Sequence, residues 1–398
     1  MLIDRISGAR VDAGEPVTLE LRDGRVGRAA GPREPHGTEL AADGRVVLPA
    51  FVDAHVHLDK AYLLGHTPGP LTPDLDKAIA AVAGVRGVVD PAEGAERAVR
   101  TLVRNGVTAA RAMVEIDPAV GLDFIALHRA LPSDLLHLQL VAFPQRGLEL
   151  PGMPALLADA MAEGLDVVGG CPYVDADPRR HLDLVFALAE RHGAPVDLHL
   201  DFHDDPGSSL LDLVVERTRA HGMAGRVTIG HVTTLAAMAP DAADRAFERL
   251  ASAGISLVAL PATDLYLAGH GRPGTRSVAP VDRARAAGVR VAVANNNIGN
   301  PFAPFGNADL VQAAWLTGIT HRLAGEADRR DLLEAITTAP AAILGLEPHG
   351  PAPGAHAHLA VLDARSVEDV VLQAPPVLAT LRDGRLVGRL ETPSITTT

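Results

Sequence analysis

The central part of the chain alternates short apolar runs with longer amphipathic stretches. There are eight such runs, at residues 47–52, 107–114, 136–143, 165–168, 196–200, 227–230, 255–260 and 289–294. Amphipathic stretches lie between most of them, at residues 91–105, 153–163, 181–192, 210–221, 239–253 and 281–287. Strands buried on both faces read as continuous apolar runs, and strand–helix repeats give a parallel sheet. Eight repeats predict an α/β fold, a (β/α)8 TIM barrel over residues 50–345.

Both ends of the chain carry a different pattern of short strands and tight turns. The first end has apolar alternation at 17–21, 25–28 and 44–48, and the second end has it at 358–362, 377–381 and 386–390. Asp-Gly at 23–24 and at 383–384 indicates a hairpin in each case. Neither end has enough strands to bury a face alone. We therefore expect residues 1–49 and 346–398 to form one composite β-sandwich domain.

Charge and cysteine content restrict the partners of this chain. Asp and Glu number 49 against 36 for Lys and Arg, so the formal net charge is −13 and no attraction to nucleic acid or to anionic membranes is expected. Cys171 is the single cysteine, which excludes an internal disulfide. The chain also lacks an apolar run of 18 residues and a secretory h-region. These features predict a cytoplasmic protein that acts on a small molecule.

Histidine and amide residues gather where the predicted strands end. His55 and His57 follow the first strand two residues apart, so both can point to the barrel axis. His199 ends the fifth strand and His231 follows the sixth, while residues 295–297 are three asparagines after the eighth. The carboxyl ends of barrel strands meet at one face. Because imidazole is a common ligand of zinc and iron, His55, His57, His199 and His231 are predicted to hold one divalent transition metal.

Five segments carry a family resemblance: LPAFVDAHVHLDKA, VAFPQRG, DLHLDFHDDP, GHVTT and NPFAPFGNADL, which start at residues 48, 141, 197, 230 and 300. The first resembles the first-strand metal motif of the amidohydrolase superfamily, and the other four resemble its cytosine deaminase-like branch. The resemblance implies zinc or iron on the same four histidines, and a possible homo-oligomer. Binuclear members carry a bridging lysine on strand four, whereas the only lysines here are Lys60 and Lys77. The resemblance therefore implies one metal ion.

Two proton carriers of that branch are replaced in this chain. Phe202 occupies the position of the catalytic glutamate three residues after the strand-five histidine, and Asn296 occupies that of the strand-eight aspartate. Neither can accept a proton as a carboxylate does. His231, His203, Asp204 and Asn296 are the candidate catalytic residues, with Asp201, Glu115 and Asp264 as further carboxylates. The alternative for Asp204 and Asp205 is a helix start before Pro206.

Substrate contacts are predicted for Gln145, Phe202, Asn297 and Phe302. Gln145 resembles the glutamine that binds the amide edge of a pyrimidine, because its side chain offers a donor and an acceptor. The alternative for Gln145 is a structural role at the barrel rim. For Lys60, a substrate contact and a solvated loop cation are equally open. Phenylalanines near the mouth would supply apolar walls.

These residues predict a metal-dependent hydrolase of a C–N bond in an amide, amidine or cyclic amide of a small polar, heterocyclic substrate. The alternative is an amidohydrolase-fold protein with altered or lost hydrolysis, a non-hydrolytic enzyme or a small-molecule binding protein, because Phe202 and Asn296 replace the usual proton carriers. A phosphate-processing barrel is disfavoured, because no glycine-rich loop leads into a helix near the last strands.

Overall fold

The computed structural model describes residues 1–27, 37–269 and 277–390, and its centre is an eight-stranded parallel sheet. The strands are β6 (Phe51–Val56), β7 (Val107–Glu115), β8 (His137–Phe143), β9 (Val167–Gly170), β10 (Val196–Leu200), β11 (Val227–His231), β12 (Ile255–Ala259) and β13 (Val291–Val293), in sequential order. The N–H of His57 donates to the Asn296 carbonyl at 2.7 Å, and the N–H of Asn296 donates to the His55 carbonyl at 2.9 Å. These bonds join the two ends of the sheet, which confirms the predicted barrel.

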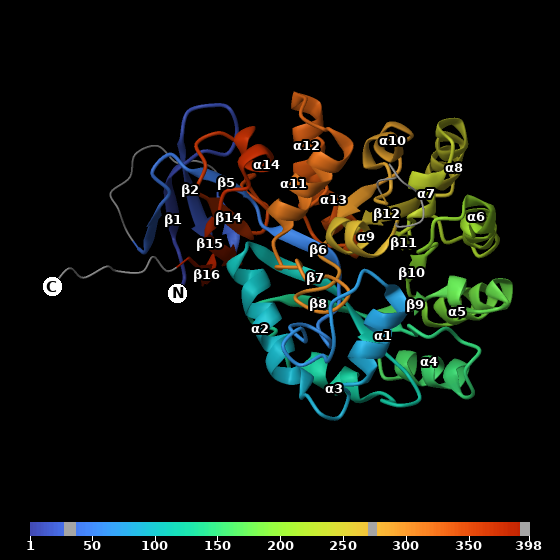
Figure 1. The fold of residues 1–398 in the computed structure, drawn as a ribbon. Coiled ribbons are helices and arrows are strands. Elements are labelled where there is room, and N and C mark those ends of the chain that lie inside the picture. Colours follow the sequence, from blue (N-terminus) through green and yellow to red (C-terminus); the bar gives the residue numbers. More distant parts are fainter. Residues whose placement is uncertain (28–36, 270–276, 391–398) are drawn as a thin grey trace.

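Helices cover the outside of the barrel (Figure 1). The predicted helices are present as α2 (Pro91–Arg104), α4 (Met153–Ala162), α5 (Pro178–His192), α6 (Leu211–Ala220), α8 (Pro240–Ser252) and α10 (Val281–Ala286). The helix α2 shows why they form here: Asp90 accepts the N–H of Ala92, Pro91 occupies the first turn, and the buried face carries alanine, valine and leucine.

Further helices were not predicted from the sequence. They are α1 (Leu75–Ala83), α3 (Asp123–Ala130), α7 (Thr234–Ala237), α9 (Pro261–Leu267), α11 (Leu310–His321), α12 (Glu326–Glu334), α13 (Thr338–Leu344) and α14 (Asp369–Gln373). Most are short, so they show little of the helical period. None of the helices in the described ranges has the length and hydropathy needed to span a bilayer.

The two ends of the chain form two four-stranded sheets beside the barrel (Figure 1). One contains β1 (Arg5–Ala9), β2 (Val17–Arg22), β3 (Arg25–Val26) and β4 (Glu39–Ala41), and the other contains β5 (Val46–Pro49), β14 (Leu359–Leu362), β15 (Val377–Arg382) and β16 (Arg385–Arg389). Val47 pairs with Val361, and Ile6, Leu21 and Leu381 lie in one buried cluster with them. The first and last segments thus share a core, as expected for a sandwich. The exact domain limits stay a prediction, and residues 28 and 391–398 lie outside the described residues.

The first apolar run was wrongly read as one strand. Residues 47–52 comprise the end of β5, which belongs to the sandwich, and the start of β6, which belongs to the barrel. β1 and β4 were also missed. Apolar content alone does not show this boundary; the signal that marks it is Pro49, the last residue of β5.

The amino-terminal end of the barrel is filled by a buried ion pair. Arg111 Nη1 donates to Asp197 at 2.7 Å, and the same guanidinium bonds Gln139, Thr228 and the Ile343 carbonyl. Arg111 is 1% exposed. Asp197 and Thr228 are the second residues of β10 and β11, whereas His199 and His231 lie at the carboxyl ends of these strands, so the ion pair and the histidines occupy different levels of the barrel.

Candidate metal centre and active site

Three histidines converge at the carboxyl ends of the barrel strands. Nε2 of His55 lies 3.1 Å from Nε2 of His199, and Nε2 of His57 lies 3.2 Å from the same atom. All three side chains are buried. Gly230 makes room for them, because a Cβ at this position would lie 3.3 Å from the His55 ring. The Phe143 ring stacks on His199 with centroids 4.0 Å apart and supports its orientation.

This donor set fits a metal ion. Hydrogen bonds alone do not account for it, because the single lone pair or proton on His199 Nε2 cannot serve two neighbouring nitrogens well. Around a tetrahedral ion with zinc–nitrogen bonds of about 2.0–2.1 Å, ligand nitrogens lie about 3.3–3.4 Å apart, close to the observed spacing. Burial lowers the pKa of His55, His57 and His199 well below the ordinary value. The rings are therefore neutral, as metal ligation requires.

The fourth predicted ligand, His231, lies at the edge of this cluster. Its ring centroid is 5.2 Å from that of His199 and 5.9 Å from that of His55. Nδ1 of His231 lies 2.6 Å from Oδ1 of Asp264, a buried carboxylate of α9. Burial raises the pKa of Asp264, while the neighbouring His231 lowers it. His231 thus has one nitrogen held by a carboxylate, and its ring lines the pocket.

Backbone strain is concentrated at these strand ends. Asp201, His231, Val232 and Asn296 all have positive φ, at 49°, 67°, 51° and 62°. Residues with a Cβ rarely adopt this conformation, at a cost of about 1–3 kcal/mol each. The backbone N–H and carbonyl of Asn296 still form hydrogen bonds, with the His55 carbonyl and the His57 N–H respectively. Its side-chain Oδ1 is buried and has no hydrogen-bond partner among the described residues, so it is available to a ligand.

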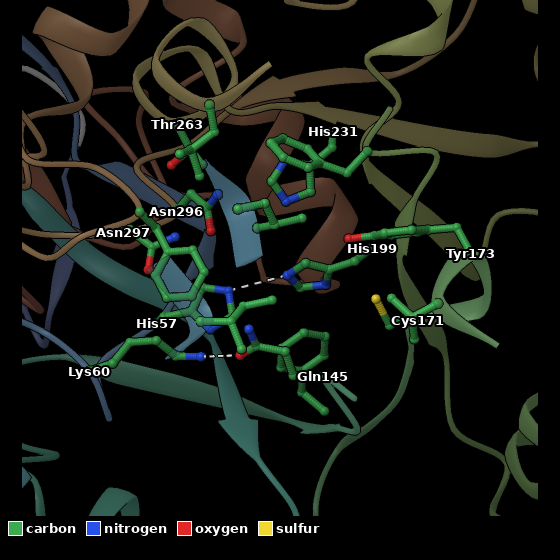
Figure 2. Close-up of a pocket in the computed structure, with 17 residues that line it drawn as sticks. His57, Lys60, Gln145, Cys171, Tyr173, His199, His231, Thr263, Asn296 and Asn297 are labelled. Carbon is green, nitrogen blue, oxygen red and sulfur yellow. Dashed lines mark hydrogen bonds between the residues drawn. The ribbon is translucent and has the colours of Figure 1, made fainter. Parts of the chain in front are cut away.

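A pocket opens over the histidine cluster (Figure 2). Phe202 and Phe302 supply part of its wall, and the Phe202 ring is 4.7 Å from that of His231. Gln145 and Asn297, the two predicted polar contacts, also line it. The complete lining is His57, Lys60, Leu75, Ile79, Phe143, Gln145, Cys171, Tyr173, Val174, His199, Phe202, His231, Thr263, Leu267, Asn296, Asn297 and Phe302. All four predicted substrate contacts thus line one pocket, and their role stays a prediction.

His203 and Asp204 lie elsewhere. Both line a neighbouring pocket with Tyr173 and Ser208, and neither lines the histidine pocket. Asp204 accepts the N–H of Gly269 at 3.0 Å. Asp205 accepts the N–H of Gly207 at the start of a short 3-10 helix, Pro206–Ser208, which is the structural alternative noted for this pair. The structure therefore does not bring His203 or Asp204 to the histidine cluster.

Lys60 is buried, although its position in the sequence allowed an exposed loop cation. Its Nζ is 3.0 Å from Glu115 and also donates to Gln145, and its side chain is 3% exposed. Arg86 is the second partner of Glu115. The adjacent first-strand motif was the one signal that could have placed Lys60 at the site. Cys171 also lines the pocket, and burial raises the pKa of its thiol to about 12, so it stays protonated.

Comparisons with known proteins agree with this geometry. A model of the amidohydrolase family matches residues 89–388. Pterin deaminase of Rhizobium rhizogenes is 30% identical over 377 residues, which are 89% of this chain and 85% of the relative. N-isopropylammelide isopropyl amidohydrolase of Pseudomonas sp. is 27% identical, with 88% of this chain and 87% of the relative covered.

Solved structures show the same relationship. The 5-methylcytosine deaminase from Klebsiella pneumoniae liganded with 5-fluorocytosine superimposes with a TM-score of 0.90 at 28% identity, and 99% of each chain is covered. N-isopropylammelide isopropylaminohydrolase from Burkholderia multivorans gives a TM-score of 0.85 at 29% identity, covering 97% of this chain and 98% of that chain. These findings confirm the resemblance inferred from the five motifs: the chain belongs to the amidohydrolase family, and its similar structures place it near the cytosine deaminases.

Proposed function

We propose that this protein is a metal-dependent hydrolase that cleaves a C–N bond of a small, polar heterocycle, in a deaminase or amidohydrolase reaction. The observation that carries the proposal is the histidine cluster: Nε2 of His199 lies 3.1 Å from Nε2 of His55 and 3.2 Å from Nε2 of His57, and His57 and His199 line a pocket. The names of the relatives support the reaction class, since a deaminase and an amidohydrolase both act on C–N bonds.

One divalent transition metal, zinc or iron, would be held by His55, His57 and His199. When bound, such an ion supplies Lewis acidity, which activates water and polarises the carbon that is attacked. Asn296 Oδ1, buried and unpaired in the described structure, is a further neutral donor at the same place. The family resemblance counts His231 as a ligand, but its position at the edge of the cluster and its bond to Asp264 support a second role.

That second role is the transfer of a proton. Phe202 carries no proton, so the work of the missing glutamate must pass to another group that lines the pocket. His231 is suited to it because Asp264 fixes Nδ1 and leaves Nε2 as the atom that can exchange a proton. Phe202 packs against this ring and limits the access of bulk water. We assign His231 as the proton carrier and Asp264 as its positioning residue.

The proposal is tested by two measurements on purified protein. Metal content after expression with added zinc or iron is expected to approach one ion per chain. Release of ammonia or amine from a panel of amino- and alkylamino-substituted pyrimidines, triazines and pterins is expected for at least one member. A metal-loaded protein without activity on the panel, or a protein with no bound metal, contradicts the proposal.

Two sequence-based expectations remain part of this proposal. The single cysteine supports a cytoplasmic location. A homo-oligomer is supported by three exposed apolar side chains: Phe305 is 79% exposed, Trp315 40% and Ile319 54%. Light scattering of the purified protein tests the oligomer, and a monodisperse monomer at high concentration would contradict it.

A further inference from the structure

One wall of the histidine pocket is formed by three polar residues from separate loops. Lys60 follows β6, Gln145 follows β8 and Asn297 follows β13. Among the described residues that line this pocket, Lys60 is the only Lys, Arg, Asp or Glu. The hydrogen bonds of these three side chains decide which of their atoms face a bound molecule.

The bond between Lys60 and Gln145 fixes the orientation of the Gln145 amide (Figure 2). A lysine ammonium group has three donors and no acceptor, so the Gln145 atom that faces it must be the carbonyl oxygen. The amide nitrogen, with two donors, is then left for the pocket. The sequence predicted that Gln145 would offer a bound molecule both a donor and an acceptor. In the structure, the acceptor oxygen of Gln145 is already bonded to Lys60.

Asn300 fixes the orientation of the Asn297 side-chain amide in the same way. Oδ1 of Asn300 accepts the backbone N–H groups of Phe302 at 3.0 Å and Ala303 at 3.2 Å, so its other side-chain atom must be the amide nitrogen. That nitrogen donates to the Lys60 carbonyl at 3.0 Å and to Asn297 Oδ1 at 2.8 Å. The oxygen of Asn297 is therefore engaged, and its NH2 group remains.

The carboxylate that pairs with Lys60 is shared with a second cation. Glu115 accepts from both Lys60 and Arg86. Asp59, the next carboxylate, accepts the backbone N–H of Glu115 at 2.9 Å, and burial raises its pKa while the charge of Lys60 lowers it. Of these four charged groups, Lys60 is the one that lines the histidine pocket. Lys60 Nζ lies 5.9 Å and 5.6 Å from the ring centroids of Phe143 and Phe302, which do not compensate a full charge.

We propose that this wall selects an anionic substrate whose recognised edge carries only acceptors, such as a ring carboxylate or an ionised imide flanked by carbonyl oxygens. The ammonium group of Lys60 and the NH2 groups of Gln145 and Asn297 all donate, whereas a neutral lactam edge offers one donor that would find no acceptor on this wall. A buried donor facing another donor is costly, and this mismatch gives discrimination. The apolar side chains of Phe202, Phe302 and Leu267 suit a flat ring. The inference rests on the proposed function for the reaction, but the wall itself is independent of hydrolysis.

The test is a binding comparison on the metal-loaded protein with two ring compounds of equal shape. Nicotinate presents two acceptor oxygens and a negative charge, whereas nicotinamide presents one acceptor and one donor group. Calorimetric titration of the wild type is expected to show roughly tenfold or greater preference for nicotinate, because a hydrogen bond to a charged group is stronger than one between neutral groups. Lys60→Met is expected to bring the two affinities within about threefold, since it removes the charge and frees the Gln145 amide to turn. The matched control is Lys77→Met, because Lys77 is the only other lysine and is exposed.

Metal content is measured on every variant, because a carboxylate can also bind a metal directly. A nicotinate preference that persists in Lys60→Met at equal metal content would show that the metal selects the anion, and would overturn the proposal. Equal affinities in the wild type would do the same. If Lys60→Met does not fold, Gln145→Glu replaces it: its carboxylate cancels the Lys60 charge and is expected to abolish the preference. Absence of hydrolysis by the metal-loaded protein would contradict the proposed function and leave the binding comparison readable.

Discussion

Nδ1 of His231 lies 2.6 Å from Oδ1 of Asp264, and both side chains are buried beside the pocket. The bond joins His231, at the end of β11, to Asp264 of α9, which lies 33 residues later in the sequence. A carboxylate behind an imidazole fixes the tautomer and raises the basicity of the outer nitrogen. In the proposed function, this pair takes over the proton transfer of the missing carriers.

Asp264→Asn is expected to reduce kcat/KM by roughly 10- to 100-fold while the metal content stays unchanged. The amide leaves His231 in place but removes the charge that stabilises its protonated form. The separate values of kcat and KM are the decisive measurement, because a group that acts only in proton transfer lowers kcat and leaves KM close to that of the wild type. Asp204→Asn, in the neighbouring pocket, serves as the control and should leave both constants as in the wild type. An unaltered kcat in Asp264→Asn would refute the role.

His199→Ala and His203→Ala form a matched pair for the metal site. His199 Nε2 is the atom shared by both short contacts of the cluster, whereas His203 lines another pocket. We expect metal per chain to fall from about one to near zero in His199→Ala and to stay near one in His203→Ala. Elemental analysis gives the content, and circular dichroism confirms that both variants are folded. Equal metal in the two variants would place the ion elsewhere.

Asn296→Asp restores a carboxylate at the strand-eight position. The side-chain oxygen there is buried and unpaired in the described structure, so the new charge is stabilised chiefly by a cation. We expect metal affinity to rise by on the order of tenfold, measured by competition with a chelator, and hydrolytic activity to appear or increase. Asn307→Asp is the control, because Asn307 is exposed and does not line the histidine pocket. Unchanged metal affinity in Asn296→Asp would count against the assignment of Asn296 to this position.

Arg111→Met is expected to destabilise the barrel by about 3–5 kcal/mol, because it leaves the Asp197 carboxylate buried without its partner. The double variant Arg111→Met/Asp197→Leu should recover most of this loss, since no buried charge remains. Denaturant unfolding measures both. Arg100→Met is the comparison for an exposed ion pair: Arg100 is 61% exposed in its pair with Glu96, and a change below about 0.5 kcal/mol is expected. An equal loss in the single and double variants would show that packing around Arg111, and not its charge, is what matters.

Stability should decline as the pH falls from about 6.5 to about 4 because of His358. Burial is the main cause that lowers the pKa of this imidazole from 6.5 to about 4, so the folded protein binds this proton less readily than the unfolded chain. A lowered folded pKa gives stability that is present above the unfolded value and is lost on acidification, by at most about 3 kcal/mol. Substitution by Asn keeps an acceptor for the Asp383 N–H and should flatten the curve of unfolding free energy against pH between those limits. His192→Asn, at an exposed position, should retain the wild-type slope.

The sequence alone determined the barrel and the histidines of the site. Eight apolar runs separated by helical stretches leave few other ways to bury so much surface, and β10 has the predicted limits, Val196–Leu200. His55 and His57 were placed by the two-residue period of a strand, which is a local property. The division between β5 and β6 was missed, because the apolar run continues from the sandwich into the barrel and only Pro49 marks the boundary.

Only the tertiary structure decided which polar groups work together. Asp264 resembles many other carboxylates in the sequence, and nothing local pairs it with His231 or pairs Lys60 with Gln145. Asp204 carried a stronger sequence signal than Asp264, yet it lies in another pocket. The physical reason is that strand and helix periods are set by neighbouring residues, whereas hydrogen-bond partners across a barrel are set by loops whose paths depend on the packing of the whole fold.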